Sequence, residues 1–300
     1  MKTIMKIISS LTLTGALAIG GLIGPVNLES KAMAASSVSI LKYPIPTKEN
    51  QILDYLERGM YEFYEGTKVR KETSVNSELA EQEEAKKSEL LQISQLTYDA
   101  LVKYKKDKKT NETKAKQTYS KTLSSLDAET KKIKQRYEKK VNTLEKYRVD
   151  EINKIAKAES YNITSMRSTE IKRISGNSGK EEIKYNIELI EKAVNSYKVE
   201  AIELKFESLI AEYKSKRKVA ELEAARKTKE LNFQYKKGSL TAKQLKTKQS
   251  NIEESKVAEQ ENIQRNIDGL IKEKNLQVQS LIKLKETVIA QIKKDNNLVL

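Results

Sequence analysis

The stretch IKQRYEKKVNTLEKYRVDEINKIAKAESYNITSMRSTEIKRI, residues 133–174, decides the fold of this chain. Its apolar residues form two rows that each repeat every eleven residues, namely Ile133, Leu144, Ile155 and Met166, and Val141, Ile152, Ile163 and Ile174. Eleven residues fill three turns at about 3.67 residues per turn, so each row runs almost straight along an α-helix. The pattern predicts a long helix with a narrow apolar seam.

The same spacing recurs elsewhere in the chain, as in Leu79, Leu90 and Leu101. Charged residues make up 33% of the sequence, and all three prolines lie within the first 46 residues. The rest of the sequence therefore contains no proline that would interrupt a helix. The sequence therefore predicts an all-α fold, an elongated antiparallel long-helix bundle or coiled coil with 11-residue (hendecad) periodicity.

A first break in the helical pattern lies at residues 176–179, where two glycines end one helix. Ser178 and Glu181 have the spacing of a capping box that starts the next helix. This break predicts helices over about 77–175 and 180–237, joined as antiparallel neighbours.

A second break lies at Gly238. Thr241 and Gln244 follow with capping-box spacing, which predicts a second hairpin. The last helix is expected over about 239–295, and the long-helix bundle as a whole over 77–300.

The charged run from Lys105 to Asn111 leaves two alternatives open. It contains no glycine, proline or capping box, so we favour one continuous helix over 77–175. The segment from Leu79 to Tyr104 would then project beyond the hairpins and need a partner. If the chain instead bends near Lys108, this segment folds back and completes a four-helix bundle.

Residues 48–76 are predicted to form a short aromatic-rich helix and a polar connection. We favour the interpretation that the rings cover one end of the bundle, because aromatic residues at helical spacing usually belong to a core. The alternative is a patch for a partner. The candidate partner-binding residues of the two segments are Leu79, Leu90, Ile93, Leu101, Tyr104, Tyr55, Tyr61, Phe63 and Tyr64.

The N-terminal residues 1–34 have the pattern of a secretory signal peptide. Lysines precede a weakly apolar run, and Ala32-Met33-Ala34 supplies the small residues of a cleavage site, so cleavage is expected after Ala34. A membrane anchor is the less favoured alternative. Residues 35–47 are expected to form an extended leader. The prediction is a Sec-exported protein, secreted or wall-associated in a Gram-positive bacterium, with no integral membrane segment in its mature chain.

The chain contains no cysteine and no histidine, which excludes thiol and imidazole chemistry. Acidic neighbours such as Glu83 with Glu84 and Glu221 with Glu223 are interpreted as solvated helix faces, since no apolar surroundings would shift their pKa values. We therefore expect no enzyme activity, no catalytic residue, no cofactor and no metal.

The formal net charge is +15, and removal of residues 1–34 would leave 54 basic and 41 acidic residues. Nine of the 57 basic residues are arginine. Lysine lacks the planar fork that binds phosphate or guanine in bidentate fashion, so the excess suits diffuse attraction to an anionic wall polymer better than nucleic acid. Along the sequence the lysines are spread over all the helices.

These features favour an exported, non-catalytic helical protein that acts by binding or as a structural component, at the Gram-positive envelope or outside the cell. A protein partner or a second copy of the chain is expected. In charge, signal peptide and helical arms the chain loosely resembles exported holdase chaperones, which implies a clamp for unfolded proteins as the alternative. A membrane-active toxin is favoured least, because the chain lacks the apolar hairpin that helical pore-forming toxins carry.

Overall fold

A computed structural model describes residues 44–176 and 178–298. The described residues form helices, turns and short irregular segments, with no strand among them. The predicted signal peptide (1–34) and most of the predicted leader (35–47) lie outside the described residues, so both stay predictions.

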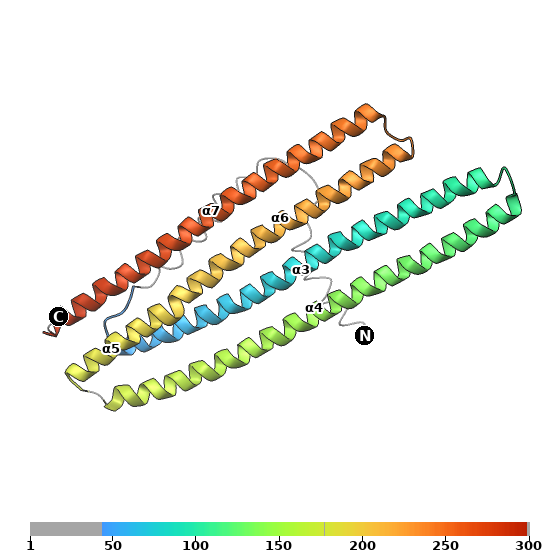
Figure 1. Ribbon diagram of the computed structural model, residues 1–300. Helices are drawn as coiled ribbons and strands as arrows, with labels where there is room; N and C mark the ends of the chain where they lie inside the picture. Colours follow the sequence, from blue (N-terminus) through green and yellow to red (C-terminus); the bar gives the residue numbers. More distant parts are fainter. Residues whose placement is uncertain (1–43, 177, 299–300) are drawn as a thin grey trace. The chain divides into compact units, whose positions relative to one another are not determined.

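The structure confirms the all-α fold. In chain order the helices are α3 (Glu49–Asp107), α4 (Glu112–Gly176), α5 (Lys180–Ala193), the five-residue π-helix η1 (Val194–Lys198), α6 (Val199–Lys236) and α7 (Ala242–Asp295). The segments α5, η1 and α6 follow one another without a break and are called the α5–α6 helix below. The long helices lie side by side in the order α4, α3, α6, α7 (Figure 1).

Helices α3 and α4 form an antiparallel hairpin. Near the start of α3, the Glu57 carboxylate lies 2.5 Å from Arg167 Nη1, late in α4. Further along α3, Glu89 Oε1 accepts a hydrogen bond of 2.8 Å from the hydroxyl of Tyr137, early in α4. The α4 seam predicted from the sequence faces this partner, since Ile133, Ile163 and Met166 are buried and its other members except Val141 are half-buried.

Helix α3 runs parallel to the α5–α6 helix, which forms the second hairpin with α7. Lys198 Nζ lies 3.0 Å from a Glu62 carboxylate oxygen, and Lys236 Nζ lies 2.5 Å from Asp99 Oδ1. The sequence separation is nearly constant in these two pairs, at 136 and 137 residues. The two hairpins therefore point in the same direction, and their turns lie at the same end of the bundle (Figure 1).

The prediction of one continuous helix over 77–175 is wrong. Helix α3 ends at Asp107 and α4 begins at Glu112. Asn111 caps α4, because its Oδ1 accepts a hydrogen bond of 3.0 Å from the backbone N–H of Lys114. The alternative with a bend near Lys108 is the one found, and the segment from Leu79 to Tyr104 packs inside the bundle instead of projecting from it.

The prediction of a short helix followed by a polar connection over 48–76 is also wrong, since α3 continues through this region. Its polar side chains bind the neighbouring helix: Lys68 Nζ lies 2.6 Å from the Glu159 carboxylate of α4. Val75, within the same stretch, is buried. These residues are compatible with a helix, and tertiary contacts compensate for their weak local apolar pattern.

The expected helix 180–237 contains a π-helical turn at η1, opposite Gly59 of α3. A Cβ atom added at Gly59 would lie 3.3 Å from Lys198 Cγ and 3.4 Å from the Ala193 carbonyl oxygen. One at Gly66 would lie 3.2 Å from Leu204 Cβ. These two glycines, which weaken a helix considered alone, allow the two helices to approach closely.

The two Gly-containing connections differ in how they cap the next helix. The box at Thr241 is confirmed: its Oγ1 accepts from Gln244 N at 3.2 Å, and Gln244 Oε1 accepts from Thr241 N at 2.9 Å. The box expected at Ser178 is wrong, because the N-cap of α5 is Gly179, which has no side chain to cap the helix. Gly179 has a φ of 62°. Glycine tolerates this left-handed conformation at little cost.

The densest core lies at the end of the bundle where α3 begins. Its fully buried side chains come from α3 and the α5–α6 helix, namely Ile52, Leu56, Met60, Leu189, Ile190, Val194 and Phe206. At the other end, residues 98–121 and 225–250 include a single buried residue, Ala115. Stability is therefore concentrated away from the two hairpin turns.

Replacing Asn111 with Ala is expected to lower the free energy of unfolding by about 1 kcal/mol, because the Lys114 N–H loses its acceptor. Chemical denaturation followed by circular dichroism measures the change. Asn153→Ala, at an exposed position within α4, is the matched control and should change stability by less than about 0.5 kcal/mol. Equal effects of the two substitutions would contradict the capping role of Asn111.

Candidate functional site

The described residues offer no arrangement typical of a catalytic or metal site. No group of three or more acidic side chains in this part of the chain is placed to hold a metal ion. Glu84, one of the acidic neighbours in the sequence, is buried and lies 3.0 Å from Arg226 Nε and 2.6 Å from Lys87 Nζ. Burial raises the pKa of Glu84, but hydrogen bonds from Lys87 and Arg226 outweigh it and keep the pKa below its usual value.

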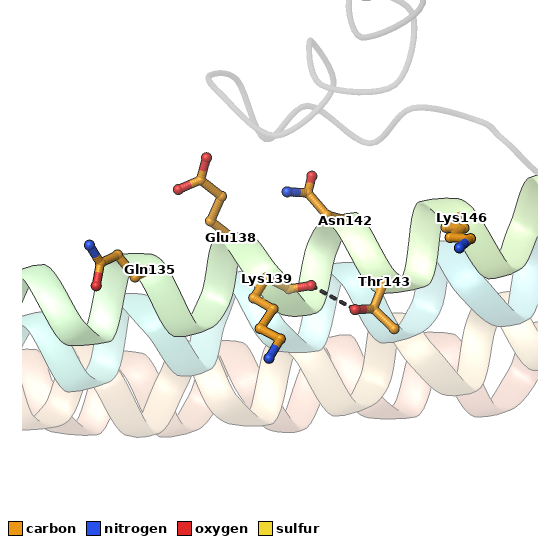
Figure 2. A pocket seen from close by; sticks show the side chains of 6 residues that line it. All are labelled: Gln135, Glu138, Lys139, Asn142, Thr143 and Lys146. Carbon is orange, nitrogen blue, oxygen red and sulfur yellow. Dashed lines mark hydrogen bonds between the residues drawn. The ribbon is translucent and has the colours of Figure 1, made fainter.

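Figure 2 shows the side chains that line a pocket on α4. All six are polar or charged: Gln135, Glu138, Lys139, Asn142, Thr143 and Lys146. The Thr143 hydroxyl donates a hydrogen bond of 2.8 Å to the Lys139 carbonyl oxygen, which is a local contact within the helix. The lining residues all come from α4 and supply one carboxylate, that of Glu138, and the ammonium groups of Lys139 and Lys146.

The aromatic candidates near the start of α3 divide into buried and accessible rings. Tyr55 is buried, Phe63 and Tyr64 are half-buried, and Tyr61 is 47% exposed. Phe63 packs edge-to-face on Tyr197 of η1, with ring centroids 6.0 Å apart. Most of this cluster contributes to the core end of the bundle, and Tyr61 is its accessible member.

Lys198 of η1 is a buried charged group of this region, with 8% of its surface exposed. Its Nζ donates hydrogen bonds of 3.1 and 3.0 Å to the two carboxylate oxygens of Glu62 and lies 4.6 Å from the centroid of the Tyr55 ring. Burial, and then the Glu62 carboxylate, raise the pKa of Tyr55 above the ordinary tyrosine value. The cluster connects α3 to η1 at the point where Gly59 brings the two helices together.

The seam candidates Leu79, Leu90, Ile93, Leu101 and Tyr104 are all half-buried on α3. This helix lies between α4 and α6, so the seam already has neighbours within the chain (Figure 1). Tyr104 stacks on Tyr119 of α4 with ring centroids 5.0 Å apart. These residues thus line the inside of the hairpins, and their role in binding a partner stays a prediction.

The structure also gathers charge that is separated in the sequence. We define the cationic tip as residues 98–121 and 225–250, which include the turn of each hairpin. These segments hold 16 Lys or Arg and 4 Asp or Glu, a net charge of +12. The other 250 residues hold 41 basic and 38 acidic residues, a net charge of +3. Nearly all the excess positive charge therefore lies at one end of the bundle.

Specific contacts bring the two halves of the cationic tip together. Besides the Lys236–Asp99 ion pair, the rings of Tyr98 and Phe233 meet edge-to-face with centroids 5.6 Å apart. Lys237 Nζ lies 5.9 Å from the Tyr98 centroid and 5.3 Å from the Phe233 centroid, within the range of cation–π attraction. The two hairpin ends therefore form one surface.

The lysines of the cationic tip are accessible to a ligand. All fifteen are exposed, and Arg226 is half-buried. Within the described chain, Lys108, Lys227 and Lys236 form ion pairs, which leaves twelve tip lysines with no carboxylate within 4 Å. Three of the four acidic residues, Asp99, Glu112 and Glu230, are themselves paired. The charge of the tip is thus largely uncompensated.

Sequence reasoning missed this surface because it followed the lysines along the chain. One local signal was available: the sequence Tyr-Lys-Lys occurs at the C-terminal end of both α3 and α6, at residues 104–106 and 235–237. Acidic residues are also scarce around both turns. The pattern shows two basic hairpin ends, but the parallel packing of α3 and α6 is needed to place them side by side.

The raised pKa of Tyr55 predicts a loss of stability in alkaline solution. Below about pH 10 the phenol keeps its proton in both states, whereas above it the unfolded chain releases the proton and the folded chain retains it. The free energy of unfolding should therefore fall as pH rises above about 10, and Tyr55→Phe should make that fall less steep. Chemical denaturation at a series of pH values measures how the free energy of unfolding changes with pH. Tyr161→Phe is the control, because Tyr161 is 74% exposed; equal slopes for the two variants would contradict the effect.

Within the described residues, no helix has the length and apolar character needed to cross a membrane. Comparison of the chain with protein-family models, curated proteins and solved structures found no match.

Proposed function

We propose that this protein is exported and acts without catalysis, as a helical binding or structural component of the Gram-positive cell envelope. The observation that carries the proposal is the cationic tip, which concentrates a net charge of +12 at one end of the bundle. The signal-peptide pattern of residues 1–34 supports the export step. The lack of histidine and cysteine in the sequence supports action by binding.

The charge distribution supports electrostatic retention. Attraction between exposed charges extends over a Debye length, about 8 Å at physiological ionic strength. A positive surface in contact with an anionic matrix is held within this range, whereas surfaces of nearly balanced charge gain little. The tip would thus be the part of the bundle in contact with the anionic envelope, and the core end would be left for a protein partner or a second copy.

Expression of the chain with a C-terminal tag in a Gram-positive host tests the proposal. The tagged protein is expected in the wall fraction, cleaved after Ala34, and released as NaCl rises from about 0.15 to about 1 M, which shortens the Debye length from about 8 to about 3 Å. Immunoblotting of the fractions and mass spectrometry of the N-terminus measure the outcome.

A cytoplasmic tagged protein would refute export. Protein found in the medium at low salt, or retained on the wall at 1 M salt, would refute electrostatic retention. A cytoplasmic protein of similar size that carries the same tag serves as the control for lysis and for binding through the tag.

A holdase-like clamp is the second candidate, and the exposed apolar side chains favour it. Leu96, Val102, Leu222 and Leu276 are 45, 47, 37 and 50% exposed. Exposed apolar groups next to positive charge suit the capture of unfolded chains, although singly scattered apolar residues are normal on protein surfaces.

Aggregation of a denatured client, followed by light scattering, tests the clamp. A clamp at equimolar concentration should suppress the scattering at moderate salt, and Leu96→Ser with Leu276→Ser should reduce the suppression. Thr118→Ser with Thr247→Ser, at two exposed positions, provides the matched control. Unchanged scattering in the presence of the wild-type protein would exclude this candidate.

A further inference from the structure

We infer that the cationic tip is a binding site for a flexible linear polyanion whose charges are phosphodiesters, such as a poly(glycerol phosphate) wall polymer. The inference deepens the proposed function and rests on it for the compartment in which the polymer is met. It adds the ligand class, the residues that bind it and the requirement for both hairpins.

Repulsion among the lysines of the cationic tip destabilises the folded chain, and a bound polyanion would offset this repulsion. Twelve exposed lysines without a carboxylate within 4 Å, in the described chain, repel one another across two packed hairpins. Such self-repulsion destabilises the compact state. A bound polyanion would relieve it, and a ligand that binds the folded state preferentially raises the stability of that state.

The distribution of the lysines around each helix favours a flexible chain over a flat or rigid partner. Lys103, Lys105 and Lys106 of α3 point in different directions around the helix axis, because successive residues are rotated by about 100°. Lys243, Lys246 and Lys248 of α7 do the same, and all six are exposed. A bilayer or a DNA duplex meets one face of such a surface, whereas a flexible polymer can follow the charges around it.

The types of side chain also argue against the other anionic partners. Fifteen of the sixteen basic groups are lysines, and the single arginine, Arg226, already lies within 4 Å of three carboxylates, those of Glu84, Glu223 and Glu230. The tip therefore has few side chains that could bind nucleic-acid bases in bidentate fashion. Among the described tip residues, the exposed large apolar side chains are Val102 and Tyr235, too few for an apolar face that inserts into a membrane.

The two hairpins should act together because they form one stepped surface. Asp99 of α3 is level with Lys236, the last residue of α6, so the eight further residues of α3 to Asp107 extend about 12 Å beyond it. A groove between α6 and α7 lies below this step. It is lined by Lys227, Lys248, Gln234, Asn251, Leu231, Ile252 and one carboxylate, that of Glu230, which is itself paired with Arg226. A polymer that contacts the step and the groove gains from both sets of lysines, as linked binding sites do.

Two lysine-to-glutamine variants of the 300-residue chain test the role of each hairpin. The first changes Lys105, Lys106, Lys109 and Lys116, and the second changes Lys229, Lys243, Lys246 and Lys248. The matched control changes Lys132, Lys134, Lys139 and Lys157, exposed lysines of α4 outside the tip. Glutamine has nearly the helix propensity of lysine, so all three variants should fold; circular dichroism and thermal unfolding verify this.

Soluble poly(glycerol phosphate) is the probe, and its affinity is measured by calorimetry over a series of salt concentrations. Each tip variant should lose about tenfold or more in affinity, and its dependence on the logarithm of salt concentration should fall by roughly a third, because four of twelve uncompensated lysines are removed. The control variant should bind within about twofold of the wild type. The polymer should also raise the melting temperature of the wild type more than that of either tip variant.

Three results of the binding measurements would overturn the inference. One is an equal loss of affinity in the control and tip variants. Another is unchanged affinity when the lysines of one hairpin are replaced. The third is equal or tighter binding, at the same phosphate concentration, to phosphatidylglycerol-containing vesicles or to a DNA duplex. Wall retention that persists in the tip variants would refute the tip as the site of retention, and with it the observation that carries the proposed function, while export and wall association would still stand. Polymer binding by a protein that is not exported would refute the proposed function alone.

Discussion

The close packing of α3 on the α5–α6 helix is the contact on which the rest of the structure depends. It joins the two hairpins, and it forms where Gly59 and Gly66 leave room for the neighbouring helix. The buried side chains of both helices, such as Leu56 and Phe206, surround this contact. Each Leu or Phe buried in this way contributes roughly 1.5–3 kcal/mol, so this end can offset unfavourable interactions elsewhere.

The same contact determines where the charge lies. Because α3 and α6 run parallel with a constant separation, the two turns that follow them meet at one end. A shift of α3 along α6 would separate Asp99 from Lys236 and Tyr98 from Phe233. Repulsion among the tip lysines is thus maintained by packing that lies mainly at the opposite end of the bundle. Because the core and the excess charge lie at opposite ends, the tip can present a charged binding surface without burying any of its charges.

The success of sequence reasoning differed from helix to helix for physical reasons. Except for exposed Val141, the seam of α4 is buried or half-buried as its spacing predicts, because a narrow stripe suits a single partner. The apolar positions Ile267, Leu281, Ile289 and Ile292 of α7 are buried as well. A turn near residues 108–111 was the less favoured of two alternatives because this stretch lacks glycine and proline. Asn111 followed by Glu112 was a usable N-terminal signal, since an asparagine cap and an acidic first turn both favour a helix start. The aromatic cluster was predicted to cover one end of the bundle, and buried Tyr55 fits that interpretation, whereas exposed Tyr61 does not.

The sequence by itself determined that the chain is helical, where α4 presents its apolar side, and that the second hairpin turns at Gly238. Each of these follows from spacing over a few residues, because the helix period and the capping contacts are local. The tertiary structure decided that α3 lies at the centre between α4 and α6, and that two basic turns about 130 residues apart form one surface. That arrangement depends on the register between α3 and α6, which are distant in sequence. Close packing at Gly59 and Gly66 sets this register, and no local sequence pattern predicts it.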